Sequence, residues 1–414
     1  MVNLENKKKI VIISSGQPCG NPRMVKEAIV LSKEGFSVTV IYCPMSPWGD
    51  EFDQKVFFEN PKILWIRVGA HPIKKRVKYF CTRLRKKVWE TVFHYMGDIC
   101  NSALKSSVLY SQELGKEAMK HKADLYIGHN LGTILAVIKA AKKYNSKSSF
   151  DFEDFHRGEE LEESFHWQRT KLIEDKFVSQ LNSAITASPL ISKAYQKCYQ
   201  ELSFQTILNV FPYRDTKVFV NSKTERLKLF WFSQTIGKGR GLESIIKASA
   251  RVIPQPSITL LGNCSKDVKK ELISLAIEEG FNLKLISFKS VMPEVSLINE
   301  AKRHHLGICS EDPITLNRDL CLTNKIFTYM LGKNALLLSN TKAQHLFLAK
   351  NKDIGVLFNL KEITELRKLI QNYQDNRELL DHHRTESFQK AKDYYNWESE
   401  SAKLTSYYKN ILLS

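Results

Sequence analysis

The sequence predicts two α/β domains in tandem, each built on a doubly wound parallel sheet of the Rossmann type. Three observations predict this fold class. The chain has 414 residues, more than one ordinary domain holds, and 43% of them are hydrophobic. Short apolar runs alternate with longer segments of helical periodicity. The alternation stops at a polar, loop-like stretch around 209–225 and then starts again.

In the first domain, apolar and β-branched runs are expected to form parallel strands. Continuous apolar strands separated by helices are typical of sheets that are covered on both faces. The expected strands are 8–14, 37–42, 63–68, 123–128, 148–152, 183–188 and 205–210. A helix is expected to begin at Pro22, because Asn21 is a good N-cap and proline suits the first helical position.

The second domain repeats the alternation and is followed by a final helix. Its expected strands are 227–233, 257–262, 283–288, 305–310, 334–339 and 354–358. In the tail, Trp397, Leu404, Tyr408 and Ile411 recur at helical spacing, which indicates an amphipathic helix. We therefore expect an N-terminal domain at 1–213, a C-terminal domain at 214–392, and a helix at 393–414 that packs back on the N-terminal domain.

The formal net charge of +18 indicates an anionic partner, such as a nucleic acid, a membrane surface or a phosphorylated ligand. No nucleic-acid recognition motif is present, so we expect no nucleic-acid partner. The eight cysteines form no CxxC pair and are expected to stay reduced in the cytoplasm. The N-terminus reads as a first strand rather than a signal peptide, and no apolar run is long enough to span a membrane.

The most basic segment is 74–96, "KKRVKYFCTRLRKKVWETVFHYM". Its first fourteen residues, 74–87, hold eight Lys or Arg and no acidic residue, and apolar residues recur through 74–96 at helical spacing. Such a helix suits peripheral binding to an anionic membrane, at the inner face of the cell membrane in a cytoplasmic protein. The alternative is a helix that packs on its own sheet and exposes a solvated basic face.

Two loops that follow expected strands can approach an anion. The stretch 233–245, "SQTIGKGRGLESI", places glycine amides and Arg240 before a helix, and a helix N-terminus and a guanidinium both favour phosphate. It matches neither the Walker A motif nor the dinucleotide fingerprint. In the first loop, Gly16 and Gly20 allow close approach of a ligand to the backbone. A solvated basic turn and a plain strand-to-helix turn are the respective alternatives.

Five segments, taken together, resemble the family 4 glycosyltransferases of the GT-B fold. They lie in the same order as in that family, from the first strand to the last helix. The segments are 14–42 with its N-P-R, 128–156 with "GHNLGT" and "DFEDFH", 232–248 with "GKGRGLESI", 322–339 with "TNKIFTYM", and 394–412 with "NWESESAKLTSYY".

The resemblance implies an enzyme that moves a sugar from a nucleotide-diphosphate donor to a saccharide acceptor, with retention of anomeric configuration. The donor would bind the C-terminal domain, and the acceptor would bind the N-terminal domain, with the two domains facing a central cleft. The acceptor would be lipid-linked, as in surface-polysaccharide assembly. The implied donor contacts are Gly16, Ser233, Arg240, Asn324 and Lys325, with Lys238 as a helper that the family does not require. Preplaced cations stabilise the leaving diphosphate, so no metal or other cofactor is expected.

The chain departs from the family at several positions. Thr328 stands where the family has a donor-binding glutamate, and Glu153 stands where it has a histidine beside the sugar. We therefore take Glu153, the nearby His156 and the matching His129 as catalytic candidates. A structural role is the alternative for each of them. The departures leave open a GT-B-fold nucleotide-sugar epimerase or a non-catalytic binder of sugar nucleotides.

Overall fold

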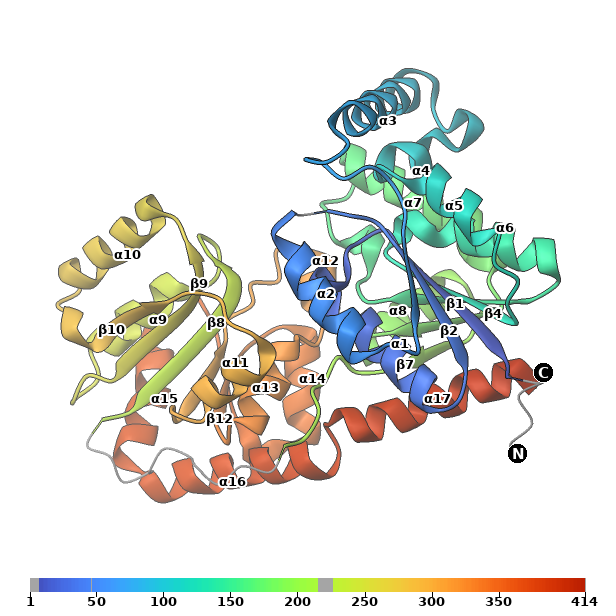
Figure 1. Ribbon diagram of the computed structural model, residues 1–414. Helices are drawn as coiled ribbons and strands as arrows, with labels where there is room; N and C mark the ends of the chain where they lie inside the picture. Colours follow the sequence, from blue (N-terminus) through green and yellow to red (C-terminus); the bar gives the residue numbers. More distant parts are fainter. Residues whose placement is uncertain (1–6, 46, 215–225, 414) are drawn as a thin grey trace. The chain divides into compact units, whose positions relative to one another are not determined.

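Two parallel β-sheets, one in each half of the chain, form the framework of the protein (Figure 1). The structure is a computed structural model that describes residues 7–45, 47–214 and 226–413. Part of the expected linker, 215–225, lies outside the described residues. Helices connect successive strands and cover both faces of each sheet, which confirms the predicted pair of doubly wound α/β domains.

The first sheet has seven strands in the order β3-β2-β1-β4-β5-β6-β7. All neighbouring strands are parallel; for example, Ile10 of β1 pairs with Val38 of β2 on one side and Leu125 of β4 on the other. The strands are β1 Lys9–Ser14, β2 Ser37–Tyr42, β3 Leu64–Arg67, β4 Leu125–His129, β5 Lys147–Phe152, β6 Ser183–Thr186 and β7 Phe204–Thr206. The strand order reverses between β1 and β4, which makes their carboxyl ends the topological switch point.

Helices of the first half lie between these strands. They are α1 Pro22–Lys33, α2 Asp50–Glu59, α3 Arg76–Met96, α4 Ser102–Ser107, α5 Ser111–Ala118, α6 Ile134–Tyr144, α7 Phe165–Phe177 and α8 Pro189–Cys198. As expected from the sequence, α1 begins at Pro22, and the Asn21 side chain accepts a hydrogen bond from the Met24 amide at 3.0 Å.

The second sheet has six parallel strands in the order β10-β9-β8-β11-β12-β13. They are β8 Lys228–Ile236, β9 Ser257–Cys264, β10 Ile286–Lys289, β11 Leu306–Cys309, β12 Ala335–Ser339 and β13 Gly355–Phe358. The strand β10 begins later than predicted, because Leu283–Leu285 forms a 3-10 helix whose N-cap is the Asn282 side chain. Here the order reverses between β8 and β11.

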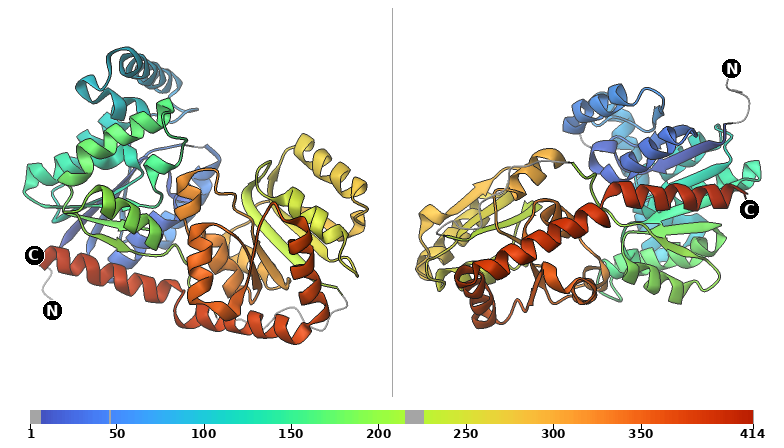
Figure 2. Two further views of the ribbon diagram at one scale, coloured as in Figure 1. Left: turned by 180° about the vertical axis from the view of Figure 1, so that it is seen from behind. Right: turned by 90° about the horizontal axis from the view of Figure 1, so that it is seen from below.

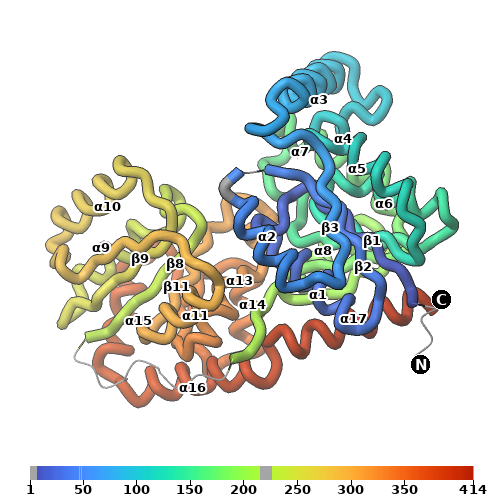
Figure 3. Tube along the Cα trace, in the orientation of Figure 1, coloured from blue at the N-terminus to red at the C-terminus, as the bar shows by residue number. Residues whose placement is uncertain are grey.

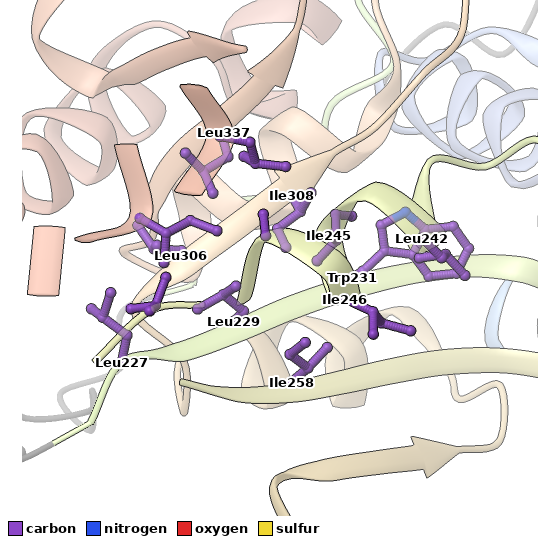
Figure 4. Packing of buried hydrophobic residues seen from close by; sticks show 14 of the residues in the cluster. Leu227, Leu229, Trp231, Leu242, Ile245, Ile246, Ile258, Leu306, Ile308 and Leu337 are labelled. Atoms are coloured by element: carbon purple, nitrogen blue, oxygen red, sulfur yellow. The ribbon is translucent and has the colours of Figure 1, made fainter. Parts of the chain in front are cut away.

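The helices of the second half continue the same alternation. They are α9 Leu242–Ala250, α10 Lys266–Glu278, α11 Glu294–Ala301, α12 Leu316–Leu320, α13 Asn324–Leu331, α14 Lys342–Lys350, α15 Ile363–Asp375, α16 Arg377–Asp393 and α17 Trp397–Leu413. Figure 4 shows the core beneath them: Leu229 and Trp231 of β8 pack with Ile245 of α9 and Ile308 of β11, all fully or nearly fully buried. The continuous apolar runs therefore form strands buried on both faces, as the sequence predicts.

The contacts divide the chain into two compact units. Unit 1 comprises 1–208 and 401–414, and unit 2 comprises 209–400. Helix α17 thus begins in unit 2 and ends in unit 1, and Figure 2 shows its last turns along unit 1. In unit 1 these turns are held by Tyr408, whose hydroxyl donates to Glu27 at 2.8 Å, and by Lys409, which pairs with Glu34 at 2.6 Å.

Helix α3 lies at the periphery of unit 1, packed on α4 (Figure 3). Its buried anchor is Phe93, whose ring centroid lies 5.2 Å from that of Phe165 on α7. Arg85 adds an ion pair with Glu113 of α5 at 2.8 Å. Across the described part of the chain, no helix combines the length and the apolar character that crossing a membrane requires.

Candidate functional site

Each unit carries a candidate site at the carboxyl edge of its sheet, next to the strands where the order reverses. Open α/β sheets bind ligands at this position, because the loops on either side of the switch point diverge and leave room. In unit 1 the relevant loops follow β1, β4 and β5. In unit 2 they follow β8 and β11.

The first loop of unit 1 follows β1 and borders a pocket of about 420 Å³. Gly16 lies in its wall, and its amide donates to the Ser14 hydroxyl at 3.1 Å. A Cβ at Gly16 would meet only ordinary contacts at 3.5 Å, so the glycine keeps the wall open rather than relieving a clash. The lining residues are Ser15, Gly16, Gln17, Cys19, Gly20, Asn21, Met45 and Asn130.

Asn130, directly after β4, borders this first-loop pocket and a second pocket beside it. Its φ of 65° and ψ of 130° are a strained combination for a residue with a Cβ, and its side-chain oxygen accepts from the Ser14 hydroxyl at 3.2 Å. Asn130 was not among the residues predicted from the sequence. Its place after a buried strand, next to His129, was the signal available.

The second pocket holds two of the sequence candidates and has a volume of about 290 Å³. Glu153 and His156 both line it, together with Asp151, Asp154 and Glu159. The lining is therefore rich in carboxylates, which accept hydrogen bonds from hydroxyl groups.

His156 lines this pocket and is held in place by Glu159. Its Nδ1 lies 3.1 Å from Glu159, and its buried Nε2 has no hydrogen-bond partner among the described residues. Burial works against the charged form, but the hydrogen bond and charge of Glu159 raise the pKa of His156 to about 9. At neutral pH His156 is thus an imidazolium, with a proton on each ring nitrogen.

Behind the pocket lies a buried cluster of charged side chains from α1, β4 and β5. His129 is fully buried, and its Nε2 forms a short contact with Glu27. Its Nδ1 lies 3.3 Å from Glu153 and 3.6 Å from Asp151. Arg23 holds Asp151 with two hydrogen bonds, at 2.6 and 3.1 Å. His129 therefore supports Glu153 from within and does not line the pocket itself.

The protonation of His129 follows from its neighbours. Both ring nitrogens face carboxylates, which can only accept, so both nitrogens carry a proton. Burial alone would lower the pKa of His129, but the charges of Glu27 and Asp151 and the hydrogen bond to Glu153 raise it to about 10. In turn, burial would raise the pKa of Glu153, but its hydrogen bond to His129 lowers it. Glu153 is thus an ionised acceptor whose side chain is 27% exposed.

Three members of this cluster, Glu27, His129 and Asp151, have ligand atoms close enough together to hold a metal ion. Those atoms already have partners. Both oxygens of Asp151 accept from Arg23, and those of Glu27 face His129 and Tyr408. A divalent ion would also stand beside the Arg23 guanidinium, which repels it. The donor set therefore suits an ion-pair network better than a metal centre.

The candidate site of unit 2 is built on the glycine-rich turn between β8 and α9. Gly239 and Gly241 adopt positive φ values of 67° and 71°, which explains why glycine alternates with charged residues there. At Gly241 a Cβ would also lie 2.4 Å from Leu360 and 2.9 Å from Ser310. The turn thereby brings backbone amides and Arg240 to the N-terminus of α9.

Arg240 is half-buried at this turn, and its guanidinium lies 3.5 Å from the Ser233 hydroxyl. Its backbone carbonyl accepts from the Ser310 hydroxyl at 2.5 Å, and Ser310 in turn accepts from the Trp231 indole at 2.9 Å. No carboxylate lies within ion-pair distance of the Arg240 guanidinium in the part of the chain that the structure describes. The loop is fixed while its cation stays available to a ligand.

Lys325, at the start of α13, and Glu311, in the loop after β11, form a close ion pair beside this turn. Burial would raise the pKa of Glu311, but Lys325 and then Arg240 hold it below its usual value. Lys325 was predicted from the sequence, but its partner Glu311 was not. Asn324, the first residue of α13, is half-buried and adjacent to Lys325.

Two further residues, Lys238 and Thr328, already have partners within the protein. Lys238 points to α10, where it pairs with Glu271 at 3.0 Å, and its side chain is 71% exposed. Thr328 is fully buried in α13, and its hydroxyl donates to the Asn324 carbonyl at 3.4 Å. The structure thus brings Ser233, Arg240 and Lys325 to one edge of the sheet, and leaves Lys238 at the periphery.

Comparisons with known proteins show which solved structures share this architecture. The chain matches no protein-family model and no curated protein sequence. Its structure is similar to sucrose-phosphate synthase from Thermosynechococcus elongatus, with a TM-score of 0.71 and 13% identity over 98% of this chain and 100% of that one. It is also similar to Anabaena HepE in complex with UDP and glucose, with a TM-score of 0.68 and 14% identity over 97% and 100% of the two chains.

A third similar structure is that of a TarM mutant of S. aureus, in complex with Fondaparinux, alpha-GlcNAc-glycerol and UDP. Its TM-score is 0.70, with 8% identity over 99% of this chain and 100% of that one. The TM-scores demonstrate a shared fold, and identities this low leave the chemistry to the residues of the site. The protein has the two-sheet α/β architecture of the GT-B glycosyltransferases.

Proposed function

We propose that the protein is a glycosyltransferase that moves a sugar from a nucleotide-diphosphate donor to a saccharide acceptor. The observation that carries this proposal is the Arg240 guanidinium, which stands without an ion-pair partner among the described residues at the carboxyl edge of the second sheet. Proteins of the same fold have been crystallised with UDP. The donor diphosphate supplies the anion that this cation lacks.

Unit 2 is the proposed donor domain. The amides at the N-terminus of α9 and the Arg240 guanidinium bind the diphosphate, and Ser233 orients Arg240. Lys325, already paired with Glu311, adds positive charge near the leaving group. Negative charge grows on the diphosphate as the glycosidic bond breaks, so these fixed cations stabilise the transition state. We propose on this basis that the reaction uses no metal and no other cofactor.

Unit 1 is the proposed acceptor domain. The ionised Glu153 carboxylate accepts a hydrogen bond from an acceptor hydroxyl in its pocket, while His129 fixes the carboxylate from behind. The His156 imidazolium adds a positive charge at the wall of the same pocket. Retention of anomeric configuration is the stereochemical course that the resemblance to family 4 implies, and we adopt it in the proposal. Gly16 keeps the neighbouring first-loop pocket open.

The proposal extends to a peripheral position at the inner face of the cell membrane, through α3. The apolar stripe of this helix is exposed: Val77 is 79% accessible, Phe80 67%, Leu84 55% and Val88 52%. Arg83 and Lys87 lie beside the stripe and are exposed, with no carboxylate partner among the described residues. A stripe flanked by cations fits an anionic bilayer. It also favours a lipid-linked acceptor of surface-polysaccharide assembly.

One observation favours a second candidate function. Thr328 occupies the position where family 4 has a donor-binding carboxylate, and its hydroxyl is buried and bonded to its own helix. Unit 2 thus lacks a carboxylate from that helix position. A GT-B-fold epimerase, or a protein that binds nucleotide sugars without turning them over, is the alternative.

Nucleotide-sugar panels test the proposal and separate it from the alternative. A donor that binds the native protein raises its melting temperature. With that donor, a transferase releases free nucleoside diphosphate, an epimerase interconverts nucleotide sugars, and a binder gives no product.

In Arg240→Ala we expect nucleoside diphosphate affinity to fall at least about tenfold, since a charge-assisted contact contributes about 1.5–3 kcal/mol. The matched control is Lys238→Ala, whose ammonium is paired with Glu271 and whose loss should leave affinity within about twofold. Equal affinity of wild type and Arg240→Ala would show that Arg240 does not bind the diphosphate and would contradict the proposal.

A further inference from the structure

A chain of hydrogen bonds connects the start of α3 with the first-loop pocket of unit 1. It passes through Asp50, the first residue of α2, which contacts segments on both sides. One Asp50 oxygen accepts from Arg67 at 2.6 Å and from Gln17 of the first loop at 3.3 Å. The other faces His71 Nε2 at 3.1 Å.

His71 caps the entry to α3. Its Nδ1 accepts from the backbone amides of Ile73 and Lys74, both at 3.1 Å. An Nδ1 that accepts is unprotonated, so the ring proton sits on Nε2 and is donated to Asp50. The tautomer is thus fixed by the geometry, and His71 transmits the position of the α3 entry to the Asp50 carboxylate.

The other end of the chain of contacts is Gln17. This side chain is 1% exposed, and its carbonyl oxygen accepts from the Met45 amide at 3.0 Å. Gln17 and Met45 both line the first-loop pocket. A second carboxylate of α2, Asp53, accepts from the Cys19 amide of the same loop at 2.8 Å. The start of α2 therefore holds both the first loop and the entry to α3.

The two ends of α3 are anchored differently. Its C-terminal part is packed through Phe93 and tied by Arg85 to Glu113. Around its N-terminal end, Ile73, Val77 and Phe80 are exposed, and the His71 cap ties that entry to Asp50. A movement of the exposed stripe would therefore be felt at the hydrogen bonds that His71 makes at the entry to α3.

We infer that His71 and Asp50 are positioning residues that couple membrane contact of α3 to the geometry of the first-loop pocket. The inference rests on the proposed membrane binding and assigns it a consequence for the proposed substrate site. Seating of the stripe in a bilayer displaces the α3 entry; His71 carries the displacement to Asp50, and Asp50 carries it to Gln17. The first loop then differs between the free and the membrane-bound protein.

Hydrogen–deuterium exchange with phosphatidylglycerol vesicles, and with phosphatidylcholine vesicles as the uncharged reference, tests this coupling. In wild type we expect anionic vesicles to slow amide exchange in 73–96 and to change exchange in 14–20 by at least about twofold. In His71→Asn the shorter amide keeps an acceptor near the position of Nδ1 and loses contact with Asp50. We expect 73–96 to remain protected by vesicles and the response of 14–20 to be lost.

Glu113→Gln is the matched control, because it removes a different tether of α3 that does not lead to the first loop. It should keep the response of 14–20. Gln17→Leu fills the same buried volume, breaks the far end of the chain of contacts and should lose the response, so the test does not depend on one variant.

Protection of 73–96 with no response of 14–20 in wild type overturns the coupling and leaves membrane binding intact. An undiminished response in His71→Asn overturns the route. No protection of 73–96 overturns membrane binding and the coupling together.

Discussion

At the scale of single residues, the pair Glu153 and His129 shows how burial assigns roles. Both were selected from the sequence, yet only Glu153 reaches a pocket. His129 is fully buried with a carboxylate at each ring nitrogen, and its hydrogen bond and charge lower the pKa of Glu153. It is a positioning residue for Glu153 in the proposed reaction. The sequence could not separate the two roles, because Glu27 lies far away along the chain and reaches His129 only through packing.

The raised pKa of His129 predicts how stability depends on pH. A histidine whose pKa rises from 6.5 to about 10 on folding contributes stability that is fully present below pH 6.5 and is lost as pH rises through about 10. His156, whose pKa is raised to about 9, acts in the same direction. We therefore expect the free energy of unfolding to fall between about pH 7 and 10.

His129→Gln should flatten this decline. It should also cost about 3 kcal/mol at pH 7, since it leaves Glu27 buried without its cation. Urea denaturation at several pH values measures both effects. The exposed His166 of α7 provides the control, His166→Gln, which should retain the wild-type pH dependence. A parallel decline in His129→Gln and wild type would show that the imidazolium does not stabilise unit 1.

At the scale of elements, the sequence predicted α3 as a helix but left its surroundings open. The periodicity of Val77, Phe80, Leu84 and Val88 indicates that these residues share one face. A shared apolar face usually packs on the protein itself. In the structure that face is exposed, and Phe93 on another face makes the contact with α7. The structure thereby shows that the stripe does not pack on the sheet and that another face of α3 holds the helix in unit 1.

We expect Phe80→Ser/Leu84→Ser to reduce co-sedimentation with anionic vesicles by at least about tenfold in apparent affinity, because it removes two apolar groups from the stripe. Neutralising Arg83 and Lys87 should also weaken binding, by about 1 kcal/mol for each charge. Lys86 is a poorer choice, since it pairs with Glu90 at 3.1 Å. The control Leu161→Ser/Leu172→Ser changes exposed leucines elsewhere in unit 1 and should bind normally. Equal sedimentation of both double variants would exclude the stripe as the membrane contact.

At the scale of the whole molecule, the chain forms two units, and α17 contributes its last turns to unit 1. The Tyr408 hydroxyl donates to the buried Glu27 and so attaches α17 to the charged cluster that supports Glu153. The amphipathic spacing of the tail predicted the helix. Its partner in the cluster could not be predicted, because residues 27 and 408 are related only through the fold.

Tyr408→Phe should destabilise unit 1 by about 1.5–3 kcal/mol, the contribution of a hydrogen bond to a charged group. Hydrogen–deuterium exchange should then rise in β1 and β4, while β8 and β11 of unit 2 remain unchanged. Trp231→Phe, which removes the indole donor to Ser310, should give the reverse distribution. A uniform increase of amide exchange across both sheets in either variant would contradict the expectation that each unit is stabilised by its own core.

The sequence by itself determined the alternation of strands and helices, the cap of α1 and the glycine-rich turn that carries Arg240. These features depend on neighbours along the chain, where periodicity and backbone conformation are local properties. Only the tertiary structure decided that Lys238 pairs with Glu271, that Glu311 accompanies Lys325, that Asn130 borders the first-loop pocket and the pocket beside it, and that the stripe of α3 is exposed. Each depends on which distant side chains meet when the sheets assemble, and packing selects those partners.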